Sequence, residues 1–325
     1  MDKVISIVKY TDAERDRWNE FVDKSRNGTF LFDRGYMDYH SDRFRDCSWM
    51  AYKGDSLAAI LPANIDSEGV IHSHQGLTYG GWILPPAHID GADLLDIFQM
   101  AVRVWRGEGI RALDYKPVPF IYTGQPSEED IYALFRLGAS VSEVNLSSAI
   151  NLQTLPGYNK LRRRILKKSK ETPFQIEETS DAEIFMALVN NCLLRRHNAQ
   201  AVHSASEIEI LKQRFPDNIR MFILKREACS LPDAGVMVYD TGRVAHTQYI
   251  ASTEEGRNKN LLTPLFDYLI STEFRHRAYF DFGTSNEEHG QYLNEGLLRQ
   301  KFSFGATGVA YRRFFLDLTS GDCQI

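Results

Sequence analysis

The order of expected helices and strands repeats along the 325 residues of this chain, and this repeat constrains the fold more than any other feature. Each half runs strand, helix, helix, antiparallel strands, helix, strand, helix, strand. Leu155, Pro156 and Gly157 break the pattern between the halves. A chain of this length also exceeds one typical domain. The sequence therefore predicts two copies of one α+β architecture, in domains covering residues 1–155 and 156–325.

The elements of this repeat have local signals. In the first half, Gly54-Asp55 joins two strand-like segments, and a turn this tight requires antiparallel strands. Residues 92–108 carry apolar side chains along one stripe, which predicts an amphipathic helix. In the second half we expect three strands, a helix and a last strand, at residues 234–239, 243–251, 279–283, 294–302 and 309–318 respectively.

The charge distribution leaves one local candidate for nucleic-acid contact. The net charge is −5 and the pI about 6.0, whereas a dedicated nucleic-acid binder is usually basic overall. Residues 160–170 nevertheless read KLRRRILKKSK, with seven basic residues in eleven. This predicted helix could contact tRNA phosphates, or it could form an ordinary solvated face. No aromatic residues alternate with its cations, as base stacking would require.

Several function classes lack their sequence signals. The four cysteines are far apart without a Cys-x-x-Cys pair, which argues against a disulfide framework or a zinc site. His72 and His74 share a strand face, but no third metal ligand is indicated. Phosphate-loop, dinucleotide and nucleophile-elbow motifs are missing. With no signal peptide and no apolar run of the roughly 20 residues that span a bilayer, we expect a cytoplasmic location.

Three stretches of the sequence carry a family resemblance. They are Asn27–Phe30 with Tyr36–His40, Gly76–Gly81, and Phe280–Thr284 leading to Lys301-x-x-Phe304-Gly305. Together they resemble FemAB-like and BioF2-like proteins, which are tandem GNAT (acyl-CoA N-acyltransferase) proteins. Gln300 stands where the Fem motif begins with Phe. The resemblance implies, in each domain, a mixed and mainly antiparallel sheet flanked by helices, with the donor site in the second domain.

The resemblance also implies an activity. An N-acyltransferase of this kind would pass an acyl or aminoacyl group from acyl-CoA or aminoacyl-tRNA to an amine. The acceptor would be a small molecule or peptide, with a cell-envelope precursor as the candidate. No tightly bound cofactor is expected, and acyl-CoA would be a co-substrate. The competing hypothesis is a catalytically degenerate GNAT-like protein that binds a metabolite or a partner. The sequence does not indicate the oligomeric state.

The expected donor segment is Arg257, Asn258, Lys259, Asn260 and Leu261, just before a predicted helix. In GNAT proteins, backbone N–H groups of this loop and the helix N-terminus hold the CoA pyrophosphate. Asn258 and Asn260 stand where the family has glycines, and asparagine is the next-best residue for a positive φ. The segment therefore reads either as a phosphate-binding loop or as an ordinary helix turn.

Lys301, His246 and Asp281 are the candidate catalytic residues. In Fem-type enzymes the matching lysine is thought to neutralise charge near the donor carbonyl; alternatively, Lys301 is a surface residue favoured by a helix dipole. His246 is the natural general base, because a histidine titrates near neutral pH, although a lone strand histidine is more often structural. Asp281 lies at a strand end, where it could contact substrate or cap the loop.

The candidate substrate-binding residues come from both halves. Tyr79 precedes two glycines that would let a ligand approach, although a packed tyrosine at a bulge is the alternative. Tyr249 shares a strand face with Thr247, opposite His246 and Gln248, and either face could line the cleft. The remaining candidates follow the Asp281 strand and are Thr284, Ser285 and Asn286.

Overall fold

The computed structural model describes residues 4–169, 171–227 and 229–319, and the chain divides into two compact units. Unit 1 comprises Met1–Asn145 with Ala310–Ile325, and unit 2 comprises Leu146–Val309.

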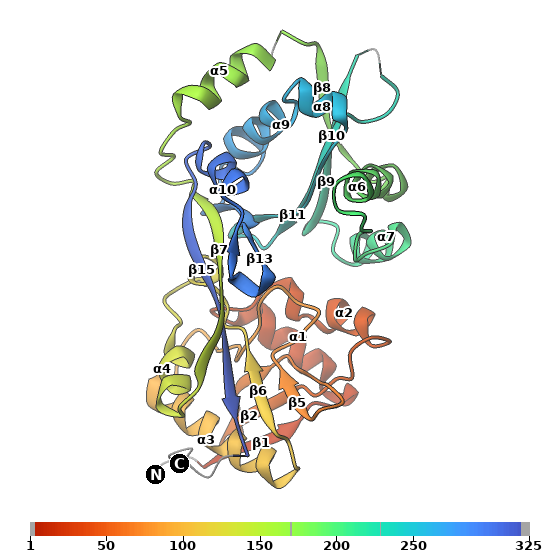
Figure 1. Cartoon of the computed structure of the whole chain (residues 1–325). Coiled ribbons are helices and arrows are strands. Elements are labelled where there is room, and N and C mark those ends of the chain that lie inside the picture. The colour runs from red at the N-terminus through yellow and green to blue at the C-terminus, as the bar shows by residue number, and fades with distance from the viewer. Residues whose placement is uncertain (1–3, 170, 228, 320–325) are drawn as a thin grey trace. The chain divides into compact units, whose positions relative to one another are not determined.

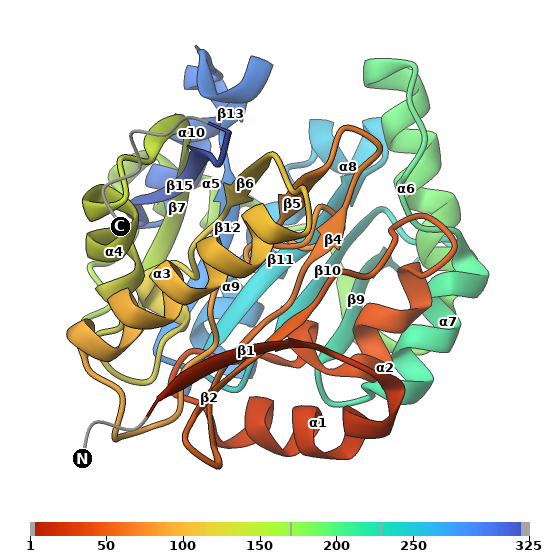
Figure 2. The ribbon, with the colours of Figure 1, turned by 90° about the horizontal axis from the view of Figure 1, so that it is seen from below.

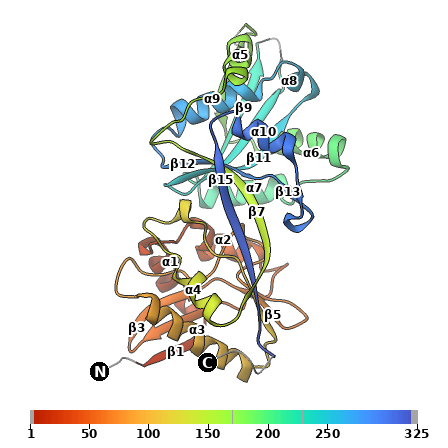
Figure 3. The same ribbon diagram turned by 60° about the vertical axis from the view of Figure 1, so that its left-hand side comes forward.

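This division differs from the predicted boundary at residue 155, because the end of the chain belongs to unit 1. The last strand, β15 (Thr307–Asp317), pairs antiparallel with β6 (Ala112–Tyr115) over residues 314–317. β7 (Ser140–Asn151) and β15 are neighbouring strands and run side by side (Figure 3). Pairing between segments this distant leaves no local signal in the sequence, so the return of the chain was not predicted.

Unit 1 contains two sheets. The first is an antiparallel sheet of β1 (Ile5–Lys9), β2 (Trp49–Lys53) and β3 (Ser56–Leu61). The second has the order β4 (Asn64–Ile65), β5 (Val70–His72), β6, β15 and β7. The helices include α1 (Arg15–Lys24), α2 (Arg34–Met37), α3 (Gly91–Gly107) and α4 (Glu129–Arg136). The predicted hairpin at Gly54-Asp55 is confirmed as β2 and β3.

Helix α3 forms the centre of the unit 1 core. It begins after a capping box made by Asp90 and Asp93, which satisfies N–H groups of its first turn. Its apolar stripe includes Leu94 and Trp105, which are completely buried. The same apolar cluster includes Trp49 from the first sheet and Leu113 from the second, so α3 packs against both sheets (Figure 2). The predicted helix at 92–108 is confirmed.

Unit 2 is built on strands in the order β7, β12, β11, β10, β9 and β8. The strands not yet defined are β8 (Phe174–Thr179), β9 (Ile219–Arg226), β10 (Ala234–Asp240), β11 (Val244–Ser252) and β12 (Tyr279–Thr284). A small hairpin of β13 (Asn286–Glu287) and β14 (Tyr292–Leu293) follows β12. The predicted elements of this half agree with the structure within two residues at each end.

Helices cover both faces of the unit 2 sheet. They are α5 (Lys160–Ser169), α6 (Ala182–His197), α7 (Ala205–Arg214), α8 (Glu254–Asn258), α9 (Leu262–Tyr268) and α10 (Glu295–Phe302). Helices α6 and α7 lie on one face and α9 on the other (Figure 1). The basic helix predicted at 160–170 is α5, and Lys170 lies outside the described residues.

The pairing of β11 with β12 sets the position of the polar residues described below. The two strands are parallel, and their register ends with His246 opposite Asp281. On its other edge β11 pairs with β10 through a bulge, because Met237 is opposite Tyr249 while Val238 is opposite Thr247. Gln248 is therefore an extra residue. A bulge redirects side chains, so the simple alternation predicted for this strand does not continue past Thr247.

Aromatic packing holds β12 under α9. The Phe266 ring of α9 lies 6.3 Å from the Phe280 ring and 5.1 Å from the Phe282 ring, both on β12. All three side chains are buried, and full burial of a phenylalanine contributes about 1.5–3 kcal/mol. The sheet under these helices is mixed and mainly antiparallel, as predicted. Across the described ranges, no helix combines the length and apolarity needed to cross a bilayer.

Candidate functional site

The three predicted catalytic residues come together in unit 2, and the centre of the group is His246 with Asp281. His246 Nδ1 lies 2.9 Å from Asp281 Oδ2. Asp281 is completely buried, whereas the His246 side chain keeps 12% of its exposure. A carboxylate at Nδ1 fixes the imidazole tautomer, so that Nδ1 carries the proton and Nε2 the lone pair. Parallel pairing of β11 with β12 produces this contact.

Neutral donors hold the Asp281 carboxylate in place. Its Oδ1 accepts hydrogen bonds from the Ser147 hydroxyl at 2.6 Å and from the Gly283 N–H at 3.0 Å. Gly283 has a φ of 75°, and the strand bends here, since two residues of β12 lie opposite Ser148 alone. Sequence reasoning missed Ser147, because it lies on β7, 134 residues before the aspartate that it contacts.

Lys301 fastens the end of β12. Its Nζ donates to the Gly283 carbonyl at 2.8 Å and to the Thr284 carbonyl at 2.7 Å, and the residue is only 4% exposed. Burial lowers the pKa of Lys301 to about 8, against the opposing effect of the Asp281 charge. The alternative of an exposed helix-end lysine is therefore wrong. With two carbonyls as partners, this ammonium positions the backbone that follows Asp281.

The rest of the Lys301-x-x-Phe304-Gly305 motif has structural roles. Phe304 packs 5.5 Å from the Phe266 ring. Gly305 has a φ of 88°, and a Cβ there would lie 2.9 Å from both the Gly157 carbonyl oxygen and Pro156 Cγ. Only glycine fits a left-handed conformation with such close backbone contact. The predicted break at 155–157 is thus the segment that packs against this motif.

Arg162 joins the basic helix α5 to the same motif, a contact that the sequence did not indicate. Its guanidinium donates to Ser303 Oγ at 2.9 Å and to Thr263 Oγ1 at 2.7 Å, and it lies 4.2 Å from the centre of the Phe304 ring. Arg162 is buried, so it does not belong to the solvent-facing charges of α5. Buried arginines of this kind satisfy several acceptors with one rigid group.

The predicted donor segment forms a turn that uses its own N–H groups. Arg257 and Asn258 belong to α8, and Thr253 Oγ1 accepts the Gly256 N–H at its start. The remaining bonds run from Arg257 N to Thr253 O, Lys259 N to Glu255 O, Asn260 N to Arg257 O and Leu261 N to Gly256 O. Asn260 has the expected positive φ, 56°. These N–H groups are already bonded, which favours the helix-turn alternative over a phosphate-binding loop.

The charged side chains around this segment also favour the helix-turn alternative over a phosphate-binding loop. Glu254 and Glu255 form the first turn of α8, where a pyrophosphate would be repelled. Lys259 lies 3.6 Å from Glu255, and Arg257 donates to the Ser252 carbonyl. Leu261 is completely buried.

Among the predicted substrate-binding residues of unit 2, Tyr249 and Asn286 contact other parts of the protein, whereas the Thr284 side chain is exposed. Tyr249 is held by a residue that sequence reasoning missed, since its hydroxyl lies 2.7 Å from His203 Nδ1. Asn286 accepts the Leu146 N–H and so supports β7. Thr284 is exposed and contributes its carbonyl to Lys301.

Three buried hydroxyls near the end of the β11–β12 pairing have no hydrogen-bond partner among the described residues. They belong to Ser148, Thr247 and Ser285, each at most 5% exposed. Leaving such a group unsatisfied costs about 1–3 kcal/mol. Buried hydroxyls are normally bonded, so these three are unsatisfied polar groups within the described residues.

Tyr79 belongs to unit 1, where it is a packed residue. It is 2% exposed, with its ring 5.9 Å from Phe32 and 4.4 Å from Tyr122. Its hydroxyl lies 3.5 Å from Thr29 Oγ1. These contacts favour the packed-tyrosine alternative.

Comparison with known proteins shows the fold. No protein-family model matches the chain, and no curated protein sequence is significantly similar to it. FemX is 12% identical, with 96% of this chain and 97% of that chain covered and a TM-score of 0.69. A tandem GNAT protein from the clavulanic acid biosynthesis pathway is 13% identical, with 98% and 100% covered and a TM-score of 0.56. L-PGS from Bacillus licheniformis is 8% identical, with 94% and 91% covered and a TM-score of 0.60.

These similarities extend over nearly the whole of each chain, although the identities are too low to carry residue roles. TM-scores of 0.56 to 0.69 over these lengths show a shared fold. The chain therefore has the fold of a FemAB-like tandem GNAT protein.

Proposed function

We propose that this protein is an N-acyltransferase whose reacting centre lies in unit 2, at His246, Asp281 and Lys301. The observation that carries the proposal is the His246–Asp281 pair, in which a buried carboxylate orients an imidazole that stays partly exposed. This is the arrangement that a general base requires. Lys301 acts as a positioning residue, because its ammonium holds the two carbonyls that follow Asp281.

The reaction follows from these groups. The acceptor nitrogen attacks the donor carbonyl carbon, and a C–N bond forms. His246 Nε2 takes the proton from that nitrogen while Asp281 stabilises the imidazolium. The bond between the carbonyl carbon and the carrier oxygen or sulfur then breaks, and the carrier leaves with the proton from His246.

Of the two candidate donors, aminoacyl-tRNA is favoured over acyl-CoA. The turn at 256–261 uses its N–H groups internally, so the usual pyrophosphate contacts of CoA are missing there. Helix α5, in contrast, presents five exposed cations, and none forms an ion pair with a described residue: Lys160, Arg163, Arg164, Lys167 and Lys168. Unpaired cations on one helix are suited to a phosphate backbone. The acceptor remains an amine of a small molecule or peptide.

Ligand-dependent melting of the full-length protein separates the donors. We expect stabilisation by tRNA charged with an amino acid, decreasing as salt rises, and little effect of CoA or acetyl-CoA. Lys167→Glu with Lys168→Glu should weaken the tRNA effect, whereas Lys24→Glu, an exposed control in unit 1, should not. Stabilisation by acetyl-CoA alone would reverse the donor assignment. No stabilisation by any donor would support the degenerate binding protein, which the bonded turn at 256–261 also favours.

A further inference from the structure

A second His–Asp pair lies at the matching place in unit 1. The parallel strands β5 and β6 end their register with His72 opposite Asp114, just as β11 and β12 end theirs with His246 opposite Asp281. In both units this is the third residue pair of the parallel step. The same atoms meet, since Nδ1 lies 2.7 Å from Oδ2 in unit 1 and 2.9 Å in unit 2.

The connections around the two pairs also correspond. Helix α3 links β5 to β6, and α8 with α9 links β11 to β12. Each His–Asp pair is therefore built by one strand–helix–strand crossover, at the point where two parallel strands stop pairing. In the sequence His72 stands out only beside His74, as part of an incomplete metal site, because its aspartate lies 42 residues away.

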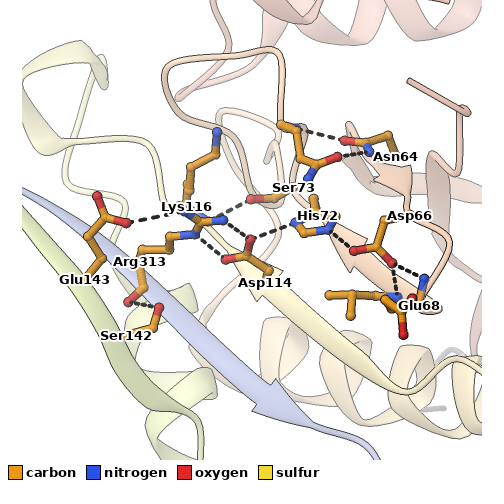
Figure 4. Close-up of polar contacts among 12 residues, drawn as sticks. Asn64, Asp66, Glu68, His72, Ser73, Asp114, Lys116, Ser142, Glu143 and Arg313 are labelled. Carbon is orange, nitrogen blue, oxygen red and sulfur yellow. Dashed lines mark hydrogen bonds and ion pairs between the residues drawn. The ribbon is translucent and has the colours of Figure 1, made fainter. Parts of the chain in front are cut away.

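The surroundings of the two pairs differ in charge. In unit 1, His72 Nε2 meets a second carboxylate, with Asp66 Oδ2 at 2.8 Å (Figure 4). The Arg313 guanidinium also binds Asp114, with Nε 2.6 Å from Oδ1 and Nη2 in contact with Oδ2. Asp281 in unit 2 instead receives a hydroxyl and a backbone N–H. The unit 1 pair is thus closed at both ends by charged groups.

Both ring nitrogens of His72 must donate. Burial opposes ionisation of Asp114, but the bonds from Arg313 and His72 lower its pKa to about 2. Asp66 is also ionised, because its Oδ1 accepts the N–H groups of Glu68 and Val70, each at 2.9 Å, and these bonds with that from His72 lower its pKa despite burial. A neutral imidazole would direct a lone pair at one of two carboxylates. The geometry therefore requires a doubly protonated ring.

We propose that unit 1 retains a closed counterpart of the unit 2 centre, in which His72 is an imidazolium clamped between Asp66 and Asp114. With no lone pair, this histidine does not act as a base. It instead ties the turn between β4 and β5, which Asp66 caps, to the neighbouring strand β6. The clamp opens when the ring loses its proton, so the β4–β5 turn is sensitive to pH in unit 1.

Other charged groups surround the clamp. Arg313 comes from β15 and also contacts Glu143 of β7 at 3.3 Å, while Glu68 lies in the turn itself. Lys116, the residue after β6, donates to the Leu77 carbonyl, and burial lowers its pKa to about 8. Lys116 is therefore a second titrating group near the clamp. A Lys116→Met variant separates its contribution, because the response of His72 should persist in that variant.

Imidazole nitrogen NMR on the full-length protein tests the proposal. The His72 signal, identified by its loss in His72→Gln, should keep the imidazolium pattern above the ordinary histidine pKa of about 6.5. Burial opposes this raised pKa, and the bonds that the ring donates to Asp114 and Asp66 cause it. Asp66→Asn should lower the pKa of His72, whereas Asp96→Asn, an exposed control on α3, should leave it unchanged.

A second readout follows the turn directly. Exchange of the Glu68 and Val70 amide hydrogens should become roughly tenfold faster in His72→Gln, since a charge-assisted bond is lost. A neutral His72 tautomer at pH 7 in the wild-type protein, or a pKa unchanged by Asp66→Asn, would overturn the proposal. The wild-type titration decides the matter even where Asp66→Asn fails to fold. These measurements concern unit 1 alone, so they are independent of whether unit 2 transfers acyl groups.

Discussion

Lys301 offers a quantitative test of the environment at the end of β12. Its side chain is buried against two carbonyls, and burial lowers its pKa from 10.5 to about 8. The folded protein then binds fewer protons than the unfolded chain between these two pH values. The contribution of Lys301 to the free energy of unfolding must therefore rise with pH across that window, by about 3 kcal/mol in total. Each tenfold change in proton affinity corresponds to about 1.4 kcal/mol.

The variant Lys301→Met removes the titrating group while keeping a chain of similar length. Between about pH 7.5 and 9.5, the wild-type protein should gain about 2 kcal/mol of unfolding free energy relative to this variant. Taking the difference cancels other groups that titrate in the same range, such as Lys116. The sign distinguishes a desolvated ammonium from one stabilised by a carboxylate, for which stability would fall as pH rises.

The assay is urea unfolding at several pH values, followed by two signals. All four tryptophans, Trp18, Trp49, Trp82 and Trp105, lie in unit 1, so their fluorescence reports that unit. Far-UV circular dichroism reports both units, and the transition without a fluorescence change belongs to unit 2. A wild-type advantage that is constant with pH, or that decreases, would mean that Lys301 is not a desolvated ammonium.

Three further predictions concern packing and charge. Gly305→Ala should lower the melting temperature, because a Cβ would meet the Gly157 carbonyl and the positive φ costs on the order of 1–3 kcal/mol. Arg162→Met should destabilise unit 2 by about 2–3 kcal/mol in urea unfolding, since two buried hydroxyls lose a charged donor, whereas the exposed Arg163→Met should be nearly neutral. Burial raises the pKa of Asp130 to about 6, against the opposing effect of the hydrogen bond from Tyr115. The unfolding free energy of unit 1 should therefore fall as pH rises from about 4 to 6. Urea unfolding followed by tryptophan fluorescence should show this dependence in the wild type and not in Asp130→Asn.

Local patterns were sufficient to predict most elements, and together with the family resemblance of the Lys301 motif they selected three residues of the candidate centre. The strands at 243–251 and 279–283 and the helix at 294–302 each have an apolar pattern of their own, and they carry His246, Asp281 and Lys301. What the sequence could not supply was the pairing between them. The 2.9 Å contact of His246 with Asp281 depends on the parallel register of two strands that are separated by a helical crossover.

The residues that were missed share one property, which is that their partners are remote in sequence. Ser147 contacts a carboxylate 134 residues away, and Arg162 contacts a hydroxyl 141 residues away. The pairing of β15 with β6 was missed for the same reason, because the two strands are far apart in the sequence. The donor segment is ambiguous for a different reason, since residue types that tolerate a positive φ also form ordinary helix turns, as Asn260 does.

The central claim is that unit 2 transfers acyl groups through His246, and a single transfer assay tests it most directly. Hydroxylamine serves as a general amine acceptor, with tRNAs charged with radiolabelled amino acids and acetyl-CoA as separate donors. Formation of the hydroxamate is measured for the wild-type protein, for His246→Gln and for His276→Gln, an exposed control in unit 2. We predict transfer by the wild type and the control, and a loss of roughly 10²–10⁴-fold in His246→Gln. Equal rates for His246→Gln and the wild type, or no transfer from any donor, would contradict the account.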